Sequence, residues 1–315
     1  MRQPYVAGLN ESMWGVMVAE VGPWAKEKLD ILARYLDFYT KVLKNQPWRT
    51  LYVDAFAGGG RAKVRNKNEP ISTPDLLGTP DAQDSEQTEF LDGSPRVALG
   101  IANPFSRYVF IEPVPKRAEE LSGLEAEFGD TRQITTLSVP AAEGIAWVTS
   151  QAISKSKHRG VAFLDPFGAR LEWSSVKSLA DTGLFEVVVN FALNMAINRM
   201  LPNDGNVPVA WAETLDRYFG SHEWFDEVYS SDAHGLFAST EIRKRDDYSV
   251  RMLELYRRNL KSAFGFVSTP RLICNTRGAP LYYLLWAGPH RKGLEGADYI
   301  LRMGDKLPKV RKEST

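Results

Sequence analysis

The stretch Leu51-Tyr52-Val53-Asp54-Ala55-Phe56-Ala57-Gly58-Gly59-Gly60 decides what kind of fold this chain can adopt. Its first six residues are β-prone and apolar apart from one carboxylate, which predicts a buried strand. Three glycines follow at once, and glycine permits both a tight turn and the close approach of a ligand to the backbone. An acidic strand end before such a turn is typical of sheets that bind a nucleotide-like cofactor. A plain strand-to-helix turn would use the same residues.

Strands and helices alternate around this stretch. Further strands are predicted at 108–111, 134–139, 161–165 and 185–191. Helices are predicted from Pro23-Trp24 for about five turns, from 94 to 101, from 116 to 128, and around Ile145 and Val176. Five β-α units in succession predict an α/β protein with a mostly parallel, doubly wound sheet. Ligands of such sheets bind at the carboxyl ends of the strands.

The remaining segments complete a predicted division of the chain. Residues 1–48 form an N-terminal helical segment, 49–193 and 263–305 form the α/β domain, 194–262 form a helical insertion, and 306–315 form a charged tail. Within the α/β domain, 266–274 and 280–286 are predicted to pair as a C-terminal antiparallel hairpin joined by 275–278. Residues 63–89 are polar and rich in Pro, and are predicted to run over the surface as a cover for the site.

Composition limits the classes of function. The chain has 315 residues, 43% of them apolar, and its 39 basic and 39 acidic side chains cancel. A globular protein without an overall attraction for polyanions follows, although a local basic groove stays possible. The single cysteine, Cys274, excludes an intrachain disulfide and fits a cytoplasmic protein. Four scattered histidines give no metal-ligand spacing, so no metal is expected. No apolar run is long enough to cross a membrane, so no membrane partner is expected.

Two polar residues follow the pattern of a nucleotide site. Glu112 ends the second strand, where a carboxylate can accept hydrogen bonds from both hydroxyls of an adenosine ribose; a solvated strand end is the alternative. Ser94 and Pro95 are predicted as the N-cap and first residue of the next helix. The free amides of that helix would face an anionic group of the cofactor, or the pair would be an ordinary cap.

Leu164-Asp165-Pro166-Phe167-Gly168 ends the fourth strand. It resembles the [D/N/S]-P-P-[Y/F] motif of amino-methyltransferases that act on nucleobases. In that motif an acid or amide oxygen and a proline carbonyl accept the two hydrogens of a planar amine, and the aromatic ring stacks on the base. Asp165, the Pro166 carbonyl and Phe167 would take these parts and orient the amine rather than act as a strong base. The second proline is absent, and a structural Asp-Pro turn is the alternative.

Over nearly its whole length the chain resembles the three-Cys-motif partner (TcmP) family. The resemblance is carried by Lys28-Leu29-Asp30-Ile31-Leu32, Tyr35-Leu36, 52–58, Gly93-Ser94-Pro95, Phe110-Ile111-Glu112, 163–168, Ile197-Asn198-Arg199, Phe219-Gly220 before Trp224, and 282–285 before His290. It implies a Rossmann-like fold of the class I methyltransferase type with S-adenosylmethionine (SAM) as cofactor. It also implies a neighbouring partner protein that carries three cysteines.

The resemblance implies a role for each matching residue of the site. Asp54 would hold the ammonium group of SAM, the backbone of 56–60 would face its amino-acid part, and Glu112 would bind the ribose. Many methyltransferases contact the adenine with an acid or amide after the third strand. This chain has Ser138-Val139-Pro140-Ala141-Ala142-Glu143 there, so Glu143 would substitute from the helix start. The cofactor residues expected are thus Asp54, Phe56, Ala57, Gly58, Gly59, Gly60, Ser94, Glu112 and Glu143.

Asn190 and Arg199 are the candidate substrate residues because Asn190 ends the fifth strand and Arg199 follows soon after it, both on the expected site face. Arg199 would bind a phosphate or carboxylate, or would tie the insertion to the sheet. Two hypotheses about function follow. The first is a SAM-dependent methyltransferase acting on an amine, on a nucleobase of DNA or RNA. The alternative is a non-catalytic SAM-fold partner or scaffold for a cysteine-rich, three-Cys-motif protein.

Overall fold

An eight-stranded sheet forms the centre of the molecule. The computed structural model describes residues 20–21, 24–64, 90–151, 153–232 and 241–303. The sheet contains, in spatial order, β6 (Ile134–Leu137), β5 (Arg107–Ile111), β2 (Arg49–Asp54), β7 (His158–Leu164), β8 (Phe185–Phe191) and β13 (Pro280–Gly288), with β11 (Phe266–Val267) and β12 (Arg271–Cys274) both paired to β13.

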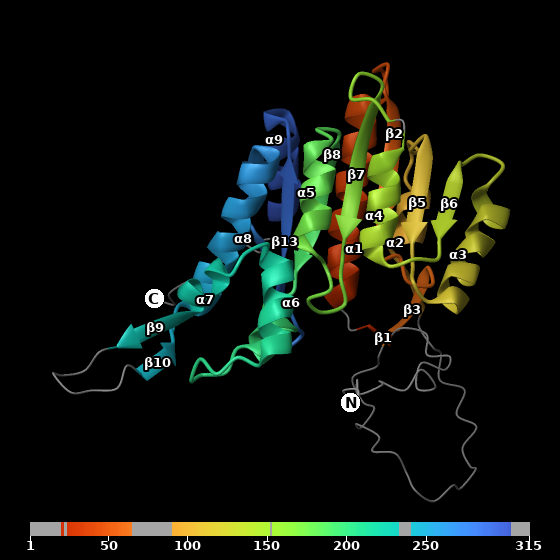
Figure 1. Cartoon of the computed structure of the whole chain (residues 1–315). Helices are drawn as coiled ribbons and strands as arrows, with labels where there is room; N and C mark the ends of the chain where they lie inside the picture. Colours follow the sequence, from red (N-terminus) through yellow and green to blue (C-terminus); the bar gives the residue numbers. More distant parts are fainter. Residues whose placement is uncertain (1–19, 22–23, 65–89, 152, 233–240, 304–315) are drawn as a thin grey trace, which may run out of the picture.

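The direction of the strands confirms the predicted α/β class. The pairs from β6 to β8 are all parallel, and the arrowheads of β5, β6 and β7 point the same way in Figure 1. β13 runs antiparallel to β8, and β12 runs antiparallel to β13, which confirms the C-terminal hairpin. From β2 the next strands of this sheet along the chain, β5 and β6, lie on one side, whereas β7, β8 and β13 lie on the other. The carboxyl ends of β2 and β7 therefore form the switch point, where such sheets bind ligands.

Helices cover both faces of the sheet. One face packs against α1 (Trp24–Leu43), α2 (Ser94–Leu99), α3 (Pro115–Phe128) and α9 (Arg291–Arg302). The other face packs against α4 (Ala141–Ser150), α5 (Trp173–Asp181), α6 (Val209–Phe219), α7 (Glu223–Val228) and α8 (Tyr248–Phe264). Neighbouring residues of a strand alternate between the two layers: Tyr52 faces α1, whereas Val53 faces the α4 side.

The 20-residue helix α1 needs the sheet to bury its apolar stripe. Leu29, Leu32 and Leu36 recur at three- and four-residue steps and are all buried. They belong to the same apolar cluster as Tyr52 and Tyr108 of the sheet. At the start of the helix, Glu27 pairs with Arg271 of β12 at 2.9 Å, which ties the N-terminal helix to the C-terminal hairpin.

The segment 194–262 is only partly helical, so that prediction was wrong in part. It contains the short 3₁₀ helix η2 (Ile197–Met200), α6, α7 and most of α8, but also an antiparallel ribbon of β9 (Tyr229–Asp232) and β10 (Glu241–Lys244). The ribbon projects at the lower left in Figure 1. Its strands have four residues each and lack a run of alternating apolar side chains, so no periodicity marked them.

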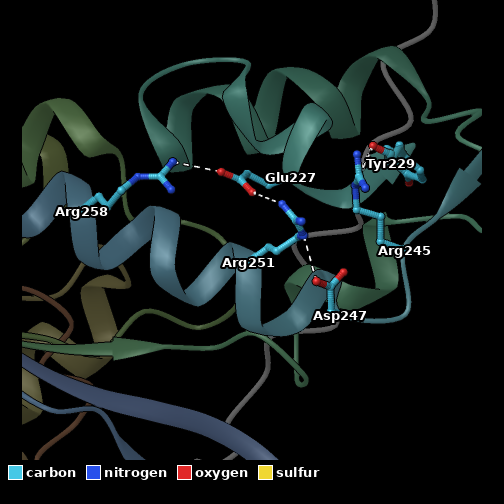
Figure 2. Close-up of polar contacts among 6 residues, drawn as sticks. All are labelled: Glu227, Tyr229, Arg245, Asp247, Arg251 and Arg258. Carbon is cyan, nitrogen blue, oxygen red and sulfur yellow. Dashed lines mark hydrogen bonds and ion pairs between the residues drawn. The ribbon is translucent and has the colours of Figure 1, made fainter. Parts of the chain in front are cut away.

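Ion pairs join α7 to α8, and a hydrogen bond joins the ribbon to the residue after β10 (Figure 2). Glu227 of α7 accepts hydrogen bonds from Arg251 at 3.2 Å and Arg258 at 3.0 Å, both on α8. Arg251 also pairs with Asp247 at 2.9 Å, and Arg245 donates to the Tyr229 carbonyl at 3.1 Å. The three arginines therefore support the packing of the segment, and the charges of Arg251 and Arg258 are paired within it.

Several boundaries and elements differ from the prediction. Gly93 is the N-cap of α2, so Ser94 and Pro95 are its first two residues rather than cap and first residue. A small sheet of β1 (Glu20–Val21), β3 (Arg61–Val64) and β4 (Phe90–Asp92) was not predicted, nor was α9. Most of the predicted cover, 65–89, and the tail 306–315 lie outside the described residues. Within the described part of the chain, no helix is long and apolar enough to cross a membrane.

A buried carboxyl group lies between the sheet and helices α1 and α9. Glu186 of β8 accepts hydrogen bonds from the Tyr35 hydroxyl and, at 3.3 Å, from Nε1 of Trp286. Burial raises the pKa of Glu186 from its ordinary 4.5 to about 7, although these hydrogen bonds oppose the shift. The folded protein therefore holds a proton on Glu186 more tightly than the unfolded chain does.

We expect Glu186 to make the folded state less stable as the pH rises. Its contribution is fully present below pH 4.5 and is lost as the pH rises to about 7, because ionisation is easier in the unfolded chain. The loss is about 3 kcal/mol for a shift of this size. Urea unfolding of Glu186→Gln between pH 4.5 and 7.5 should show a flatter pH profile than the wild type.

Glu213→Gln is the matched control because Glu213 is exposed on α6. Its profile should follow that of the wild type. A Glu186→Gln profile as steep as the wild-type one would contradict the assignment.

Candidate functional site

Five polar side chains lie in a row along the carboxyl edge of the sheet, on the face that packs against α1. They are Glu112 after β5, Asp54 at the end of β2, Asp165 after β7, Asn190 in β8 and Tyr282 in β13. The register aligns Asp54 with Phe110 and Phe163, and Leu164 with Val189, so these strands end at similar heights. We call these five residues the polar row. It brings together side chains that the sequence placed at separate strand ends.

Asp54 is fully buried, and its carboxyl group has three hydrogen-bond donors around it. The Phe56 amide donates to Oδ1 at 3.3 Å, the Tyr52 hydroxyl donates to Oδ2 at 3.3 Å, and the Ser94 hydroxyl also donates. Burial raises the pKa of Asp54 from its ordinary 3.8 to about 7. The donors lower it and the charge of Asp165 raises it further. Asp54 therefore orders the glycine turn and the first turn of α2.

The three glycines of the turn differ in what surrounds them. Gly58 and Gly60 have positive φ angles of 62° and 79°, which side-chain-bearing residues rarely adopt. The Gly93 amide donates to the Gly60 carbonyl at 2.9 Å, and a Cβ on Gly93 would lie 3.1 Å from the Gly60 backbone. A Cβ on Gly59 would overlap Glu120 of α3, whereas one on Gly58 would meet nothing within 4 Å. A ligand can thus approach the turn most closely at Gly58.

Glu112 and Glu143 differ in exposure. Glu112 is only 4% exposed, and its Oε1 accepts a hydrogen bond from the Val114 amide at 3.0 Å. It is therefore not a solvated strand end. Glu143 is exposed in the first turn of α4, and Gly144 beside it packs directly against Ile111 of β5.

Both carboxylate oxygens of Asp165 are engaged by neighbouring side chains. Lys28 of α1 forms an ion pair with Oδ2, and Nδ2 of Asn190 donates to Oδ1 at 2.6 Å. The Lys28 ammonium also lies 5.5 Å from the centre of the Tyr282 ring. The Asn190 amide oxygen and the Tyr282 hydroxyl are buried and have no hydrogen-bond partner. Asp165 is thus the centre of a connected polar cluster of four residues.

Lys28 and Tyr282 are the site residues that sequence reasoning missed. Lys28 and Tyr282 stand only among the residues that carry the resemblance, where neither is given a role. A signal for Lys28 did exist, because Lys28, Leu32 and Tyr35 follow the helical spacing of the buried stripe. A lysine in such a stripe needs a charged partner when it is buried. The partner, Asp165, lies 137 residues away in the sequence, and no local pattern linked it to Lys28.

The residues after Asp165 form part of the surface. Pro166 is buried, but Phe167 is 58% exposed, and Gly168 follows with a positive φ of 77°. A Cβ on Gly168 would lie 4.0 Å from that of Ala196, so the loops after β7 and β8 lie side by side. Phe167 is therefore available for contact with a ligand from the solvent side.

Arg199 is exposed in η2. Its neighbour Asn198 makes contacts within the segment 194–262, where its Oδ1 accepts hydrogen bonds from Lys244 and Tyr248, both at 2.7 Å. Among the residues with described positions, no three His, Cys, Asp or Glu side chains are grouped so that they could hold a metal ion.

No protein-family model and no curated protein matches the chain. A Legionella pneumophila protein of the family DUF519 is similar in structure, with 15% identity, coverage of 82% of this chain and 96% of the other, and a TM-score of 0.40.

Two methyltransferases with bound S-adenosylhomocysteine (SAH) are also similar. The magnesium protoporphyrin IX enzyme of Synechocystis has 11% identity, 84% and 83% coverage and a TM-score of 0.37. The O-methyltransferase of Bacillus cereus has 11% identity, 81% and 80% coverage and a TM-score of 0.38.

The fold class is defined by the sheet itself. The spatial order β6-β5-β2-β7-β8-β13, with only β13 of these strands reversed and β12 beyond it, is a Rossmann-like α/β arrangement of the class I methyltransferase type. The polar row lies at the edge where ligands of this class of fold bind.

We expect the Lys28–Asp165 pair to stabilise the fold more than a surface pair does. Its side chains are only 14% and 21% exposed, whereas those of the Lys177–Asp181 pair are 58% and 61% exposed. Lys28→Met leaves a partly buried carboxylate without its counter-charge and should cost on the order of 1–3 kcal/mol. Lys177→Met should cost only about 0.3–0.5 kcal/mol.

Urea unfolding at pH 7 measures both effects. The double variant Lys28→Met/Asp165→Asn should recover part of the loss because no unpaired charge remains. Equal losses in Lys28→Met and Lys177→Met would show that the Asp165 pair adds nothing beyond a surface contact.

Proposed function

We propose that this protein is a SAM-dependent methyltransferase that acts on an amine, on a nucleobase of DNA or RNA. The observation that supports it most directly is the polar row, which continues across the switch point of the sheet. Asp54 and Glu112 lie on one side of this point, and Asp165 and Asn190 lie on the other. Such a division suits two ligands that meet at the switch point, a cofactor and an acceptor.

The first half of the row suits SAM. The open backbone at Gly58 would admit the amino-acid part of the cofactor next to Asp54, and the buried Glu112 would bind the ribose hydroxyls. Bound there, SAM would supply a methyl group to the lone pair of the acceptor nitrogen, leaving SAH and a proton. Asp54 orders the turn, and this order would place the remaining cofactor residues around SAM. They are Phe56, Ala57, Gly60 and Ser94.

The second half of the row suits a planar acceptor. The exposed ring of Phe167 would stack on a base, and the Pro166 carbonyl with the Asp165 cluster would orient its amine. Holding the nitrogen in one direction is a proximity effect and needs no strong base. Arg199, exposed in the loop after β8, would contact a phosphate or carboxylate of the substrate.

The Lys28–Asp165 ion pair also favours a second candidate function. A charge that is already paired leaves Asp165 less available to an incoming amine. A non-catalytic SAM-fold partner of a three-Cys-motif protein, as in the TcmP family, would tolerate this arrangement. Cofactor binding without methyl transfer to any acceptor would favour this second candidate.

Calorimetry with SAM and SAH tests the assignment of the two halves. We expect micromolar binding to the wild type, at least tenfold weaker binding to Asp54→Ala, and nearly unchanged binding to Asp165→Ala. Transfer of labelled methyl groups to DNA or RNA should be lost in Asp165→Ala. Equal losses of SAM affinity in the two variants would mean that Asp165 is only structural. No binding to a well-folded wild type would remove the cofactor proposal.

The affinity for SAM should also rise with pH. The ammonium group of the cofactor favours the ionised form of Asp54, whose pKa is raised to about 7 by burial. Between pH 6 and 7.5 the ionised fraction, and with it the affinity, increases about eightfold. Calorimetry across this range on the wild type and on Asp54→Asn measures the effect. An equally flat profile in both proteins would contradict contact between Asp54 and the ammonium.

A further inference from the structure

Each carboxylate oxygen of Asp165 already accepts a hydrogen bond from a neighbouring side chain. Lys28 donates to Oδ2 and Asn190 donates to Oδ1. Lys28 also neutralises the charge that would otherwise attract an amine. Asp165 is therefore held within the cluster, and only its remaining lone pairs are left for a ligand.

Asp165 instead fixes the direction of the Asn190 side chain. A carboxylate can only accept hydrogen bonds, so Asn190 must turn its Nδ2 toward Asp165. The opposite orientation would place two acceptor oxygens against each other. As a result the Asn190 Oδ1 atom points away from Asp165, and it is buried without a partner. A buried acceptor with no donor is uncommon and indicates an absent ligand or water.

Tyr282 presents a second unpartnered atom to the same cluster. Its residue is 2% exposed, its hydroxyl has no hydrogen-bond partner, and its ring lies beneath the Lys28 ammonium. Asn190 pairs in register with Leu284, and Tyr282 precedes Leu284 by two residues on the same face of β13. Burial raises the pKa of Tyr282 well above its ordinary value, with further contributions from Asp165 and Glu27. The hydroxyl therefore stays protonated.

We propose that the Asn190 amide oxygen and the Tyr282 hydroxyl hold the methyl acceptor, and that this acceptor is an uncharged exocyclic amine. Asp165 and Lys28 are then positioning residues that turn the Asn190 amide. Because the Lys28–Asp165 pair is neutral overall, the cluster offers no net negative charge to hold a protonated amine such as a lysine side chain. An uncharged amine of adenine or cytosine needs no such charge and can donate to Asn190 Oδ1. This inference rests on the proposed function and specifies its acceptor.

The variants Tyr282→Phe and Tyr39→Phe test the inference as a matched pair. Each removes a buried hydroxyl that has no partner, and Tyr39 lies in the second half of α1, where its ring stacks on Phe105. Neither change should lower the urea midpoint of unfolding, because no hydrogen bond is lost. Calorimetry should show unchanged SAH affinity in both.

Fluorescence anisotropy with labelled 12-nucleotide oligo(dA), oligo(dC) and oligo(dT), in the presence of SAH, then measures acceptor binding. Adenine and cytosine carry an exocyclic amine, and thymine does not. The wild type and Tyr39→Phe should prefer oligo(dA) or oligo(dC) over oligo(dT). Tyr282→Phe should lose this preference by roughly five- to tenfold. Asp165→Asn, which removes the charge that turns the amide, should also reduce the preference while SAH affinity is kept.

The remaining outcomes separate a failure of the inference from a failure of the proposed function. A preference kept in Tyr282→Phe, or lost equally in Tyr39→Phe, would overturn the inference. So would a wild type that binds SAH and shows no preference among the three oligomers. A wild type that binds neither SAM nor SAH would instead overturn the proposed function on which the inference rests.

Discussion

All parallel strands of a sheet end at one edge, and the rest of this site depends on that constraint. β5, β2, β7 and β8 carry their polar residues at or next to their carboxyl ends, so side chains far apart in the chain become neighbours. The antiparallel β13 then adds Tyr282 from the opposite direction. α1 covers this face and places Lys28 against Asp165. The strand topology thus brings the residues of the polar row together, and the individual side-chain contacts add to that arrangement.

The sequence predicted the sheet well because each buried strand carries its own apolar pattern. β8 was expected over the residues it occupies, and Asp54, Glu112, Asp165 and Asn190 were expected at strand ends. α9 was not, since Gly293 and Gly296 weaken a helical pattern. The structure gives the reason for these glycines. A Cβ on Gly296 would overlap Phe38 of α1, and one on Gly293 would crowd Glu186 and Trp286. The two glycines are thus required by tertiary packing, which a local sequence pattern does not show.

Two carboxyl groups are buried at different depths of the same sheet face. Asp54 lies at the carboxyl edge, and Glu186 lies near the start of β8 under Tyr35 and Trp286. Burial raises the pKa of each to about 7. Glu186 has tyrosine and tryptophan as its donors and packs against Gly288 and Gly293, which fits a role in packing α1 and α9. Asp54 instead lies beside the glycine turn, which remains open at Gly58. Asp54 can therefore contact a ligand, whereas Glu186 supports the core.

The polar cluster around Asp165 joins residues from both ends of the chain, and this has a consequence for biosynthesis. Asp54 and Glu112 leave the ribosome early, together with the first strands that support them. Tyr282 and the hairpin that contains it are made much later, and β13 must then insert beside β8. A nascent chain can therefore complete the environment of Asp54 well before that of Asn190. Until β13 is in place, β8 has an unpaired edge that a chaperone, or a second nascent chain, could occupy.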